Sequence, residues 1–225
     1  MNTAENDGED KGGIMGQHGK VGCGCLIFIL IVCMVITGIF MHPLTLKIIG
    51  RQLRYEDKVV QADIIFVPRC IEDRNGELYT ESFRGYWAGN GKTIFVEEDR
   101  ILGVSLTELI QKMAKGRGIK ESVVRGLETE GGEALRAAKV KEKFAGMGYK
   151  KIIIIVPEYA SRRFHLLYGS SQGDAKVIYM IKPVTVSFFA MDKWWKESTS
   201  RLIVMKEFYN MGSYYLARFK YGESK

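Results

Sequence analysis

KKIIIIVPEYASRRFHLLYG, residues 150–169, is the most informative segment about the architecture of this chain. Its five consecutive apolar residues, Ile152–Val156, are too few for a self-sufficient helix and are rich in β-branched side chains. Such a run is typical of a strand that is buried on both faces. Pro157 ends the run, and apolar spacing predicts a helix from Tyr159 onward. A buried strand that leads directly into a helix is where α/β proteins place their ligands.

Strand and helix patterns also alternate on both sides of this segment. Further strands are expected at 62–67, 93–96, 122–127 and 176–181, and helices at 77–88, 105–115 and 132–147. This alternation indicates βαβ units. We therefore expect an α/β, Rossmann-like domain with a mostly parallel sheet of about five strands and helices on both faces, preceded by one transmembrane helix.

The C-terminal region, residues 192–219, is expected to form one long amphipathic helix. We expect its apolar stripe to pack on the sheet, and contact of its aromatic and basic residues with membrane headgroups is the alternative. The stripe contains Trp195, Leu202, Met205, Tyr209 and Leu216, which recur at helical spacing.

The N-terminal region predicts a membrane anchor. Residues 1–20 are polar and without periodicity, which is typical of a disordered tail. The next 21 residues, Val21–Met41, carry no charge, and about 20 apolar residues cross a bilayer core. We therefore expect a transmembrane anchor at 21–42, because a cleaved signal peptide would have a shorter apolar run and an A-x-A-like site. A juxtamembrane segment at 43–60 and the α/β domain at 61–225 follow.

Composition restricts the classes of partner. The formal net charge is +7, and because residues 1–20 hold two Lys and four acidic residues, the remainder carries +9. This balance is compatible with a small anionic or phosphate-bearing ligand or with an anionic membrane surface. No basic-aromatic recognition motif is present, so we expect no nucleic acid partner; the sequence identifies no protein partner.

Common cofactor motifs are missing from the sequence. GxGxxG and GxxxxGK[ST] do not occur, so dinucleotide binding and P-loop phosphate binding are unsupported and no cofactor is identified. No CxxC pair is present, and we expect no metal centre of His and Cys. The cysteines are Cys23, Cys25, Cys33 and Cys70, and the histidines are His18, His42 and His165.

Polar residues follow four of the expected strands and should meet at one edge of the sheet. The acidic group Glu97–Asp99 could hold Mg²⁺, although a solvated turn is the simpler interpretation. The residues are Arg69, Glu72, Asp73 and Arg74 after the first strand, Glu97, Glu98 and Asp99 after the second, Glu128, Thr129, Glu130 and Glu133 after the third, and Glu158, Tyr159, Arg162 and Arg163 after the fourth.

Two arginines at the start of the expected helix point to a negatively charged neighbour. Arg162 and Arg163 lie near the positive end of the helix, where a cation is disfavoured by about 0.3–1 kcal/mol. The neighbour is either a bound anion, held together with helix amides, or a carboxylate such as Glu133. Tyr159 either orients the ligand or packs at the edge. The candidate ligand-binding residues are Arg163, Tyr159, Glu133, Arg162 and Glu158.

These residues resemble the YdcF/SanA/ElyC family, a bacterial domain of unknown function often tethered by one N-terminal helix. The resemblance spans about residues 62–219. The family strand aDxIVVLG is similar to ADIIFVP here, its EEA-type turn to Gly132-Glu133-Ala134, and its VTSxYHxxRA turn to VPEYASRRF. Its W-rich segment and final helix are similar to Trp194-Trp195 followed by Glu207 to Tyr215.

The resemblance implies a Rossmann-like fold, pocket positions at Glu133, Tyr159 and Arg163, and a role in bacterial envelope biogenesis or maintenance. It also implies an outward-facing, periplasmic or extracytoplasmic domain at the inner or plasma membrane, whereas the charges that flank the anchor favour a cytoplasmic one. Three departures indicate a changed ligand or a lost activity. Pro68-Arg69-Cys70 replaces a Gly-rich turn, Glu97-Glu98-Asp99 replaces an SGG-type turn, and Ala160 replaces the motif His.

Three functions remain open on this basis. The first is a membrane-anchored domain that binds a small anionic or phosphate-bearing ligand. The second is an enzyme that acts on a phosphorylated or nucleotide-like substrate, with Glu133 or Glu158 as general base and Arg163 as the stabiliser of developing charge. The third is a non-catalytic scaffold that holds a partner protein.

Overall fold

The computed structural model describes residues 19–70, 73, 75–101, 103–169 and 177–222. Residues 1–18 of the tail predicted at 1–20, the polar candidates Glu72 and Arg74, and Lys176 at the start of the strand expected at 176–181 lie outside these residues. Gly19 and Lys20, which were also assigned to the tail, instead begin a helix. The chain divides into two units, residues 1–45 and 46–225, which are described separately.

The first unit contains the helix expected in the apolar run. Helix α1 covers Gly19–Met41, and helix α2, Pro43–Arg51, begins in this unit and continues into the second. The apolar side chains between Leu26 and Met41 are exposed. Within the described residues no helix is by itself long and apolar enough to cross a membrane, and only the bent pair Cys25–Met41 with Pro43–Arg51 meets that requirement. The transmembrane anchor therefore stays a prediction.

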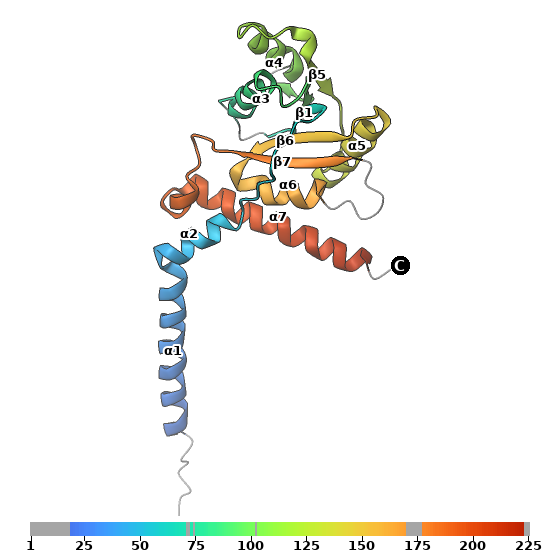
Figure 1. The fold of residues 1–225 in the computed structure, drawn as a ribbon. Helices are drawn as coiled ribbons and strands as arrows, with labels where there is room; N and C mark the ends of the chain where they lie inside the picture. Colours follow the sequence, from blue (N-terminus) through green and yellow to red (C-terminus); the bar gives the residue numbers. More distant parts are fainter. Residues whose placement is uncertain (1–18, 71–72, 74, 102, 170–176, 223–225) are drawn as a thin grey trace, which may run out of the picture. The chain divides into compact units, whose positions relative to one another are not determined.

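The second unit is built on a five-stranded parallel sheet, which confirms the predicted α/β, Rossmann-like class (Figure 1). The strand order is β5-β2-β1-β6-β7, so the chain reverses its direction of winding between β1 and β6. This reversal creates a crevice at the carboxyl ends of these two strands. The strands are β1 Ile64–Val67, β2 Thr93–Glu97, β5 Val124–Leu127, β6 Lys151–Pro157 and β7 Ile178–Val184.

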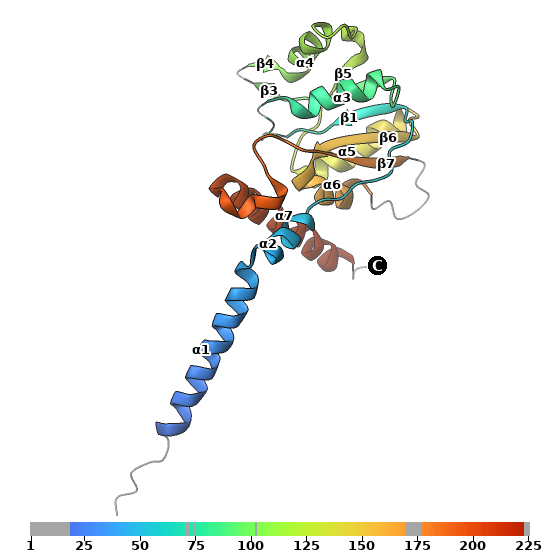
Figure 2. The ribbon, with the colours of Figure 1, turned by 60° about the vertical axis from the view of Figure 1, so that its left-hand side comes forward.

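Helices cover both faces of this sheet (Figure 2). Helices α3 and α4 lie on one face, and α5, α6 and α7 lie on the other. A small antiparallel pair, β3 Arg100–Ile101 and β4 Val104–Ser105, precedes α4, and three short 3₁₀ helices are interspersed. The elements are α3 Glu77–Trp87, α4 Leu106–Lys115, η1 Glu121–Val123, α5 Glu133–Gly146, η2 Glu158–Ala160, α6 Ser161–Tyr168, η3 Met191–Lys196 and α7 Ser198–Gly222.

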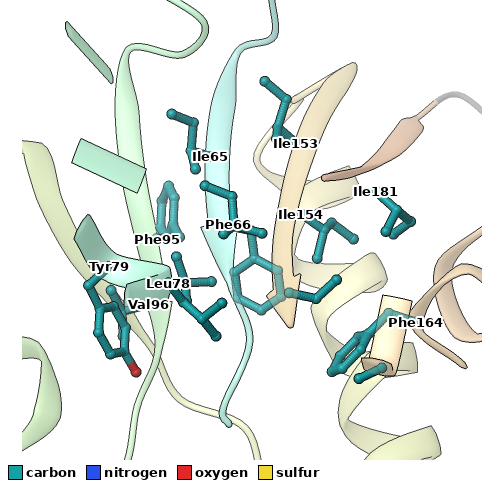
Figure 3. Packing of buried hydrophobic residues seen from close by; sticks show 14 of the residues in the cluster. Ile65, Phe66, Leu78, Tyr79, Phe95, Val96, Ile153, Ile154, Phe164 and Ile181 are labelled. Atoms are coloured by element: carbon teal, nitrogen blue, oxygen red, sulfur yellow. The ribbon is translucent and has the colours of Figure 1, made fainter. Parts of the chain in front are cut away.

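Successive side chains of each strand point to opposite faces of the sheet, so the sheet packs against helices on both faces. On β1, Phe66 meets the rings of Phe144 and Tyr168, which belong to α5 and α6. Its neighbour Ile65 lies beside Gly85 of α3. Figure 3 shows these two side chains of β1 among the buried residues of neighbouring strands and helices. Every residue of β1 is buried. Ile152–Val156 of β6 are also all buried, as their continuous apolar run predicted.

The start of α4 has one of the two hydrogen bonds of a capping box. Ser105 is the N-cap residue, and its hydroxyl accepts a hydrogen bond from the Glu108 N–H at 3.3 Å. At the other end Gly118 has φ 78°, a conformation that favours glycine. These signals are local, so the sequence alone was sufficient to find them.

The prediction of one continuous helix over 192–219 was wrong. The region consists of η3 and α7, separated by Glu197 in an extended conformation (φ −113°, ψ 137°). Trp194 of η3 is buried against Gly50, and its indole Nε1 donates to the Leu46 carbonyl at 2.8 Å. This long-range contact holds η3 against α2 and therefore competes with a continuous helix.

The expected packing face of α7 was also wrong. The residues in contact with the domain include Ile203, Val204 and Met211, which are buried. The predicted stripe faces outward, since its members in α7 are all exposed: Leu202, Met205, Tyr209 and Leu216. Apolar residues occupy both sides of this helix, so spacing alone did not determine which side packs.

Replacing Phe66 by alanine is expected to lower the free energy of unfolding by about 3–5 kcal/mol, because the ring fills the space between the sheet, α5 and α6. Urea unfolding of the full-length chain in detergent, followed by near-UV circular dichroism, measures this change. Leu135→Ala, at an exposed position of α5, is the control and should change the value by less than about 0.5 kcal/mol. Equal losses in the two variants would contradict the packing described above.

Candidate functional site

A cavity of about 310 Å³ lies at the winding reversal between β1 and β6. Its walls come from the segments after these two strands, from the first turn of α5 and from α7. The lining residues are Arg69, Cys70, Glu133, Arg136, Tyr159, Ala160, Arg163, Phe164, Lys206 and Asn210. The predicted candidates Glu133, Tyr159 and Arg163 are thus brought together.

Arg163 is held by two carboxylates. Its Nε donates to Glu207 Oε2 at 2.6 Å and its Nη2 to Glu207 Oε1 at 3.1 Å, while Nη1 pairs with Glu133. Burial by itself lowers the pKa of this guanidinium, but the glutamates more than offset burial, so the pKa is raised above its ordinary value. The negative neighbour expected beside Arg163 therefore includes the protein's own carboxylates.

Glu207 is the partner that sequence reasoning missed. It belongs to α7, 44 residues away from Arg163, and its side chain is only 4% exposed. The available signal was an acidic residue between Val204 and Met211 on a helix face that is otherwise apolar. A buried carboxylate on such a face normally has a cationic partner.

A second carboxylate, Glu97 at the end of β2, organises the other side of the cavity. It is 2% exposed and accepts hydrogen bonds from the Arg69 N–H at 2.7 Å and from Arg136 Nε at 2.8 Å, as well as from the Thr129 hydroxyl. The interpretation of 97–99 as a solvated turn was therefore wrong for Glu97. Sequence reasoning also missed Arg136, although it lies three residues after Glu133 and shares its helix face.

Glu98 is likewise engaged within the protein. Its carboxylate accepts from the Ser105 hydroxyl at 2.9 Å, from the Leu106 N–H at 3.0 Å and from the Thr107 hydroxyl. Burial raises the pKa of Glu98, but these hydrogen bonds outweigh burial and the pKa is lowered. Among the described residues, no group of three or more His, Cys, Asp or Glu is arranged to hold a metal ion.

Tyr159 is largely a packing residue. It is buried, and its ring contacts those of Phe188 and Phe189. Its hydroxyl, which lies 3.8 Å from Cys70 Sγ, is at the wall of the cavity. The packing interpretation and the lining position are therefore both realised in one residue.

Glu158 lies in a different cavity, of about 570 Å³. Its Oε2 accepts from the Thr185 hydroxyl at 3.2 Å and lies 3.5 Å from Arg54 Nη1. Burial raises the pKa of this carboxyl, although Thr185 and Arg54 counteract part of the effect. The structure thus places Glu158 apart from Arg163.

Arg162 also does not line the cavity of Arg163. Its backbone N–H donates to the Leu53 carbonyl at 3.0 Å. The next residue back, Ser161, accepts from the Tyr55 N–H at 2.8 Å. Leu53 and Tyr55 of the segment at 43–60 therefore bond to backbone and hydroxyl groups at the start of α6.

Most of the charged side chains that line the cavity are cations, although three of them are paired with carboxylates. Of its ten lining residues, Arg69, Arg136, Arg163 and Lys206 are cations, and Glu133 is the single carboxylate. Buried carboxylates outside the lining set, Glu97 and Glu207, hold two of these guanidinium groups in place. Such an arrangement favours a compact anion with several acceptor oxygens.

Comparison of the chain with known protein families, curated proteins and solved structures finds no match. The resemblance to the YdcF/SanA/ElyC family therefore stays a prediction.

Replacing Glu207 by glutamine is expected to lower the free energy of unfolding by about 3–5 kcal/mol, because it leaves Arg163 buried with a single carboxylate. Glu133→Gln should cost less, since the Glu133 side chain is 33% exposed and solvent compensates part of the loss. Chemical unfolding of both variants measures the difference. Equal costs, or a larger cost for Glu133→Gln, would contradict the role of Glu207.

Proposed function

We propose that this chain is a single-pass membrane protein whose α/β domain binds a small anionic or phosphate-bearing ligand in the cavity between β1 and β6. The main support is the set of four cations on a cavity wall that carries one carboxylate. The cavity lies at the winding reversal, where α/β sheets bind their ligands. Its volume of about 310 Å³ is at the lower end of the range for small-molecule sites.

The anchor is proposed for residues 21–42. The support is the uncharged run of 21 residues and the exposure of its apolar side chains from Leu26 to Met41. The resemblance to the YdcF/SanA/ElyC family supports an outward-facing domain and a role in bacterial envelope biogenesis or maintenance. Both are part of the proposal.

An enzyme that acts on a phosphorylated or nucleotide-like substrate is the second candidate function. Glu133 supports it, as a partly exposed carboxylate on the same cavity wall as Arg163. In that case Glu133 is the general base and Arg163 stabilises developing negative charge. Glu158 is the weaker candidate for the base, because it lines the other cavity.

Native mass spectrometry of the detergent-solubilised full-length chain is expected to show a co-purifying anion. Thermal unfolding with inorganic phosphate, a nucleotide or a sugar phosphate then identifies the class that stabilises the domain. Lys206→Gln should weaken that binding about tenfold, because it removes one charge-assisted hydrogen bond. Lys112→Gln, at an exposed position of α4, is the control with the same charge change. An empty chain with no thermal shift, or equal losses in both variants, would contradict the ligand site.

The full-length chain is expected to remain in bacterial membranes during alkaline extraction. Leu30→Lys combined with Met34→Lys should release it, since each charge at a helix centre costs about 2.5–3.5 kcal/mol of insertion energy. Val60→Lys, at an exposed position outside the anchor, is the control. A C-terminal alkaline phosphatase fusion should be active, because the enzyme requires an oxidising compartment. Extraction of the unmodified chain would contradict the anchor, and an inactive fusion would contradict the outward orientation.

A further inference from the structure

The outer face of α7 carries a continuous apolar stripe. Its members Leu202, Met205, Tyr209 and Leu216 are between 66% and 75% exposed. Their spacings of three, four and seven residues place them on one side of the helix. Phe219 extends the stripe by one more turn and is also exposed.

The other side of α7 is already occupied by the domain. Ile203, Val204 and Met211 are buried there, and Glu207 pairs with Arg163. A helix that is apolar around most of its circumference is normally covered on all sides. Soluble domains rarely expose a long apolar stripe unless it is an interaction surface.

Charge and aromatic content favour an anionic bilayer as the cover. Of the charged residues in α7, four are basic and only Glu207 is acidic, and its carboxylate is buried against Arg163. Aromatic residues with basic neighbours on an amphipathic helix are typical of the membrane interface. The basic residues are Arg201, Lys206, Arg218 and Lys220, and the aromatic ones are Phe208, Tyr209, Tyr214, Tyr215, Phe219 and Tyr221.

The composition of the stripe is less suited to a second copy of the chain. A self-associating helix seam requires Leu, Ile or Val at its repeating positions. Here Tyr209 and Gly212 occupy two of them. The excess of basic residues would also bring like charges together in a symmetric pair.

The attachment of the preceding segment agrees with a bilayer on this side of the domain. Within the second unit, Leu46 accepts from Trp194 of η3 at 2.8 Å, and Lys47 Nζ lies 3.0 Å from Asp192 Oδ2. Because η3 leads directly into α7, Leu46 and Lys47, the residues of the second unit that follow the apolar run in sequence, are bound close to the start of α7.

We propose that the outer face of α7 lies in the headgroup layer of an anionic bilayer. This inference rests on the anchor of the proposed function, which brings the domain to a membrane. It adds a second contact, made by the folded domain itself. Lys206 and Asn210 of the same helix line the ligand cavity, so the contact places one wall of that cavity at the bilayer surface.

The test uses the full-length chain with its four native cysteines replaced by serine and one new cysteine, at Tyr209→Cys or Leu216→Cys, that carries an environment-sensitive fluorophore. The chain is reconstituted into vesicles of phosphatidylcholine and phosphatidylglycerol (7:3) that contain a nitroxide-labelled lipid. A probe at Glu142→Cys, an exposed position on α5, is the matched control. We expect blue-shifted emission and strong nitroxide quenching at 209 and 216 but not at 142.

Two further measurements make the outcome specific to the stripe. Leu202→Glu combined with Met205→Glu should abolish quenching at 216, and vesicles of phosphatidylcholine alone should reduce it. Quenching at 209 and 216 no stronger than at 142 overturns the proposal. So does a water-exposed probe at 209 when the unlabelled Tyr209→Cys chain forms 209–209 disulfide dimers on oxidation, a result that would identify a second copy as the cover.

Alkaline extraction of the same vesicles separates this inference from the anchor. A chain that is retained but shows no quenching at 209 or 216 overturns the α7 contact and leaves the anchor in place. A chain that is extracted but is quenched at both positions before extraction supports the α7 contact and overturns the anchor.

Discussion

The ion pair of Arg163 with Glu207 and Glu133 is the constraint on which the site depends. It joins three helices that are far apart in the sequence, because Arg163 belongs to α6, Glu133 to α5 and Glu207 to α7. A buried charge is tolerated only with a partner. The pair therefore fixes the rotation of α7: with Glu207 turned toward the domain, the apolar residues on the other side of the helix must face outward. One electrostatic requirement thus shapes the cavity and exposes the stripe.

The sheet was predictable because its signals are local. A parallel strand buried on both faces is written as a continuous β-branched run, as in Ile152–Val156, and each such run became a strand. The break before α7 was not predictable in this way, since it depends on Trp194 reaching Leu46 across 148 residues.

Three of the candidate site residues converge because the carboxyl ends of parallel strands meet at one edge. Arg162 diverges from Arg163 because adjacent residues of an α-helix differ by about 100° in direction. Glu158 belongs to the preceding 3₁₀ helix η2 and lines the other cavity.

The carboxylates around the cavity have two separate functions. Glu97 and Glu207 lie behind the wall and hold guanidinium groups through hydrogen bonds of 2.6–2.8 Å. These hydrogen bonds compensate for the free-energy cost of burying the two carboxylates. They also restrict the side-chain conformations of Arg136 and Arg163 before a ligand binds. Glu133 is different, because it is partly exposed on the wall itself. An anion that enters the cavity competes with Glu133 for Arg163, whereas the buried carboxylates keep the cation in position.

The turn after β1 determines how a ligand can be recognised here. In dinucleotide-binding sheets this turn is rich in glycine, so the backbone approaches the phosphate and its amides bind it directly. In this chain the turn is Pro68-Arg69-Cys70, and the Arg69 N–H is consumed by Glu97 at 2.7 Å. Proline has no N–H to offer. Pro68 and Arg69 therefore offer no free amide to the proposed anion, and the donors that the described residues place around the cavity are mainly guanidinium and ammonium groups.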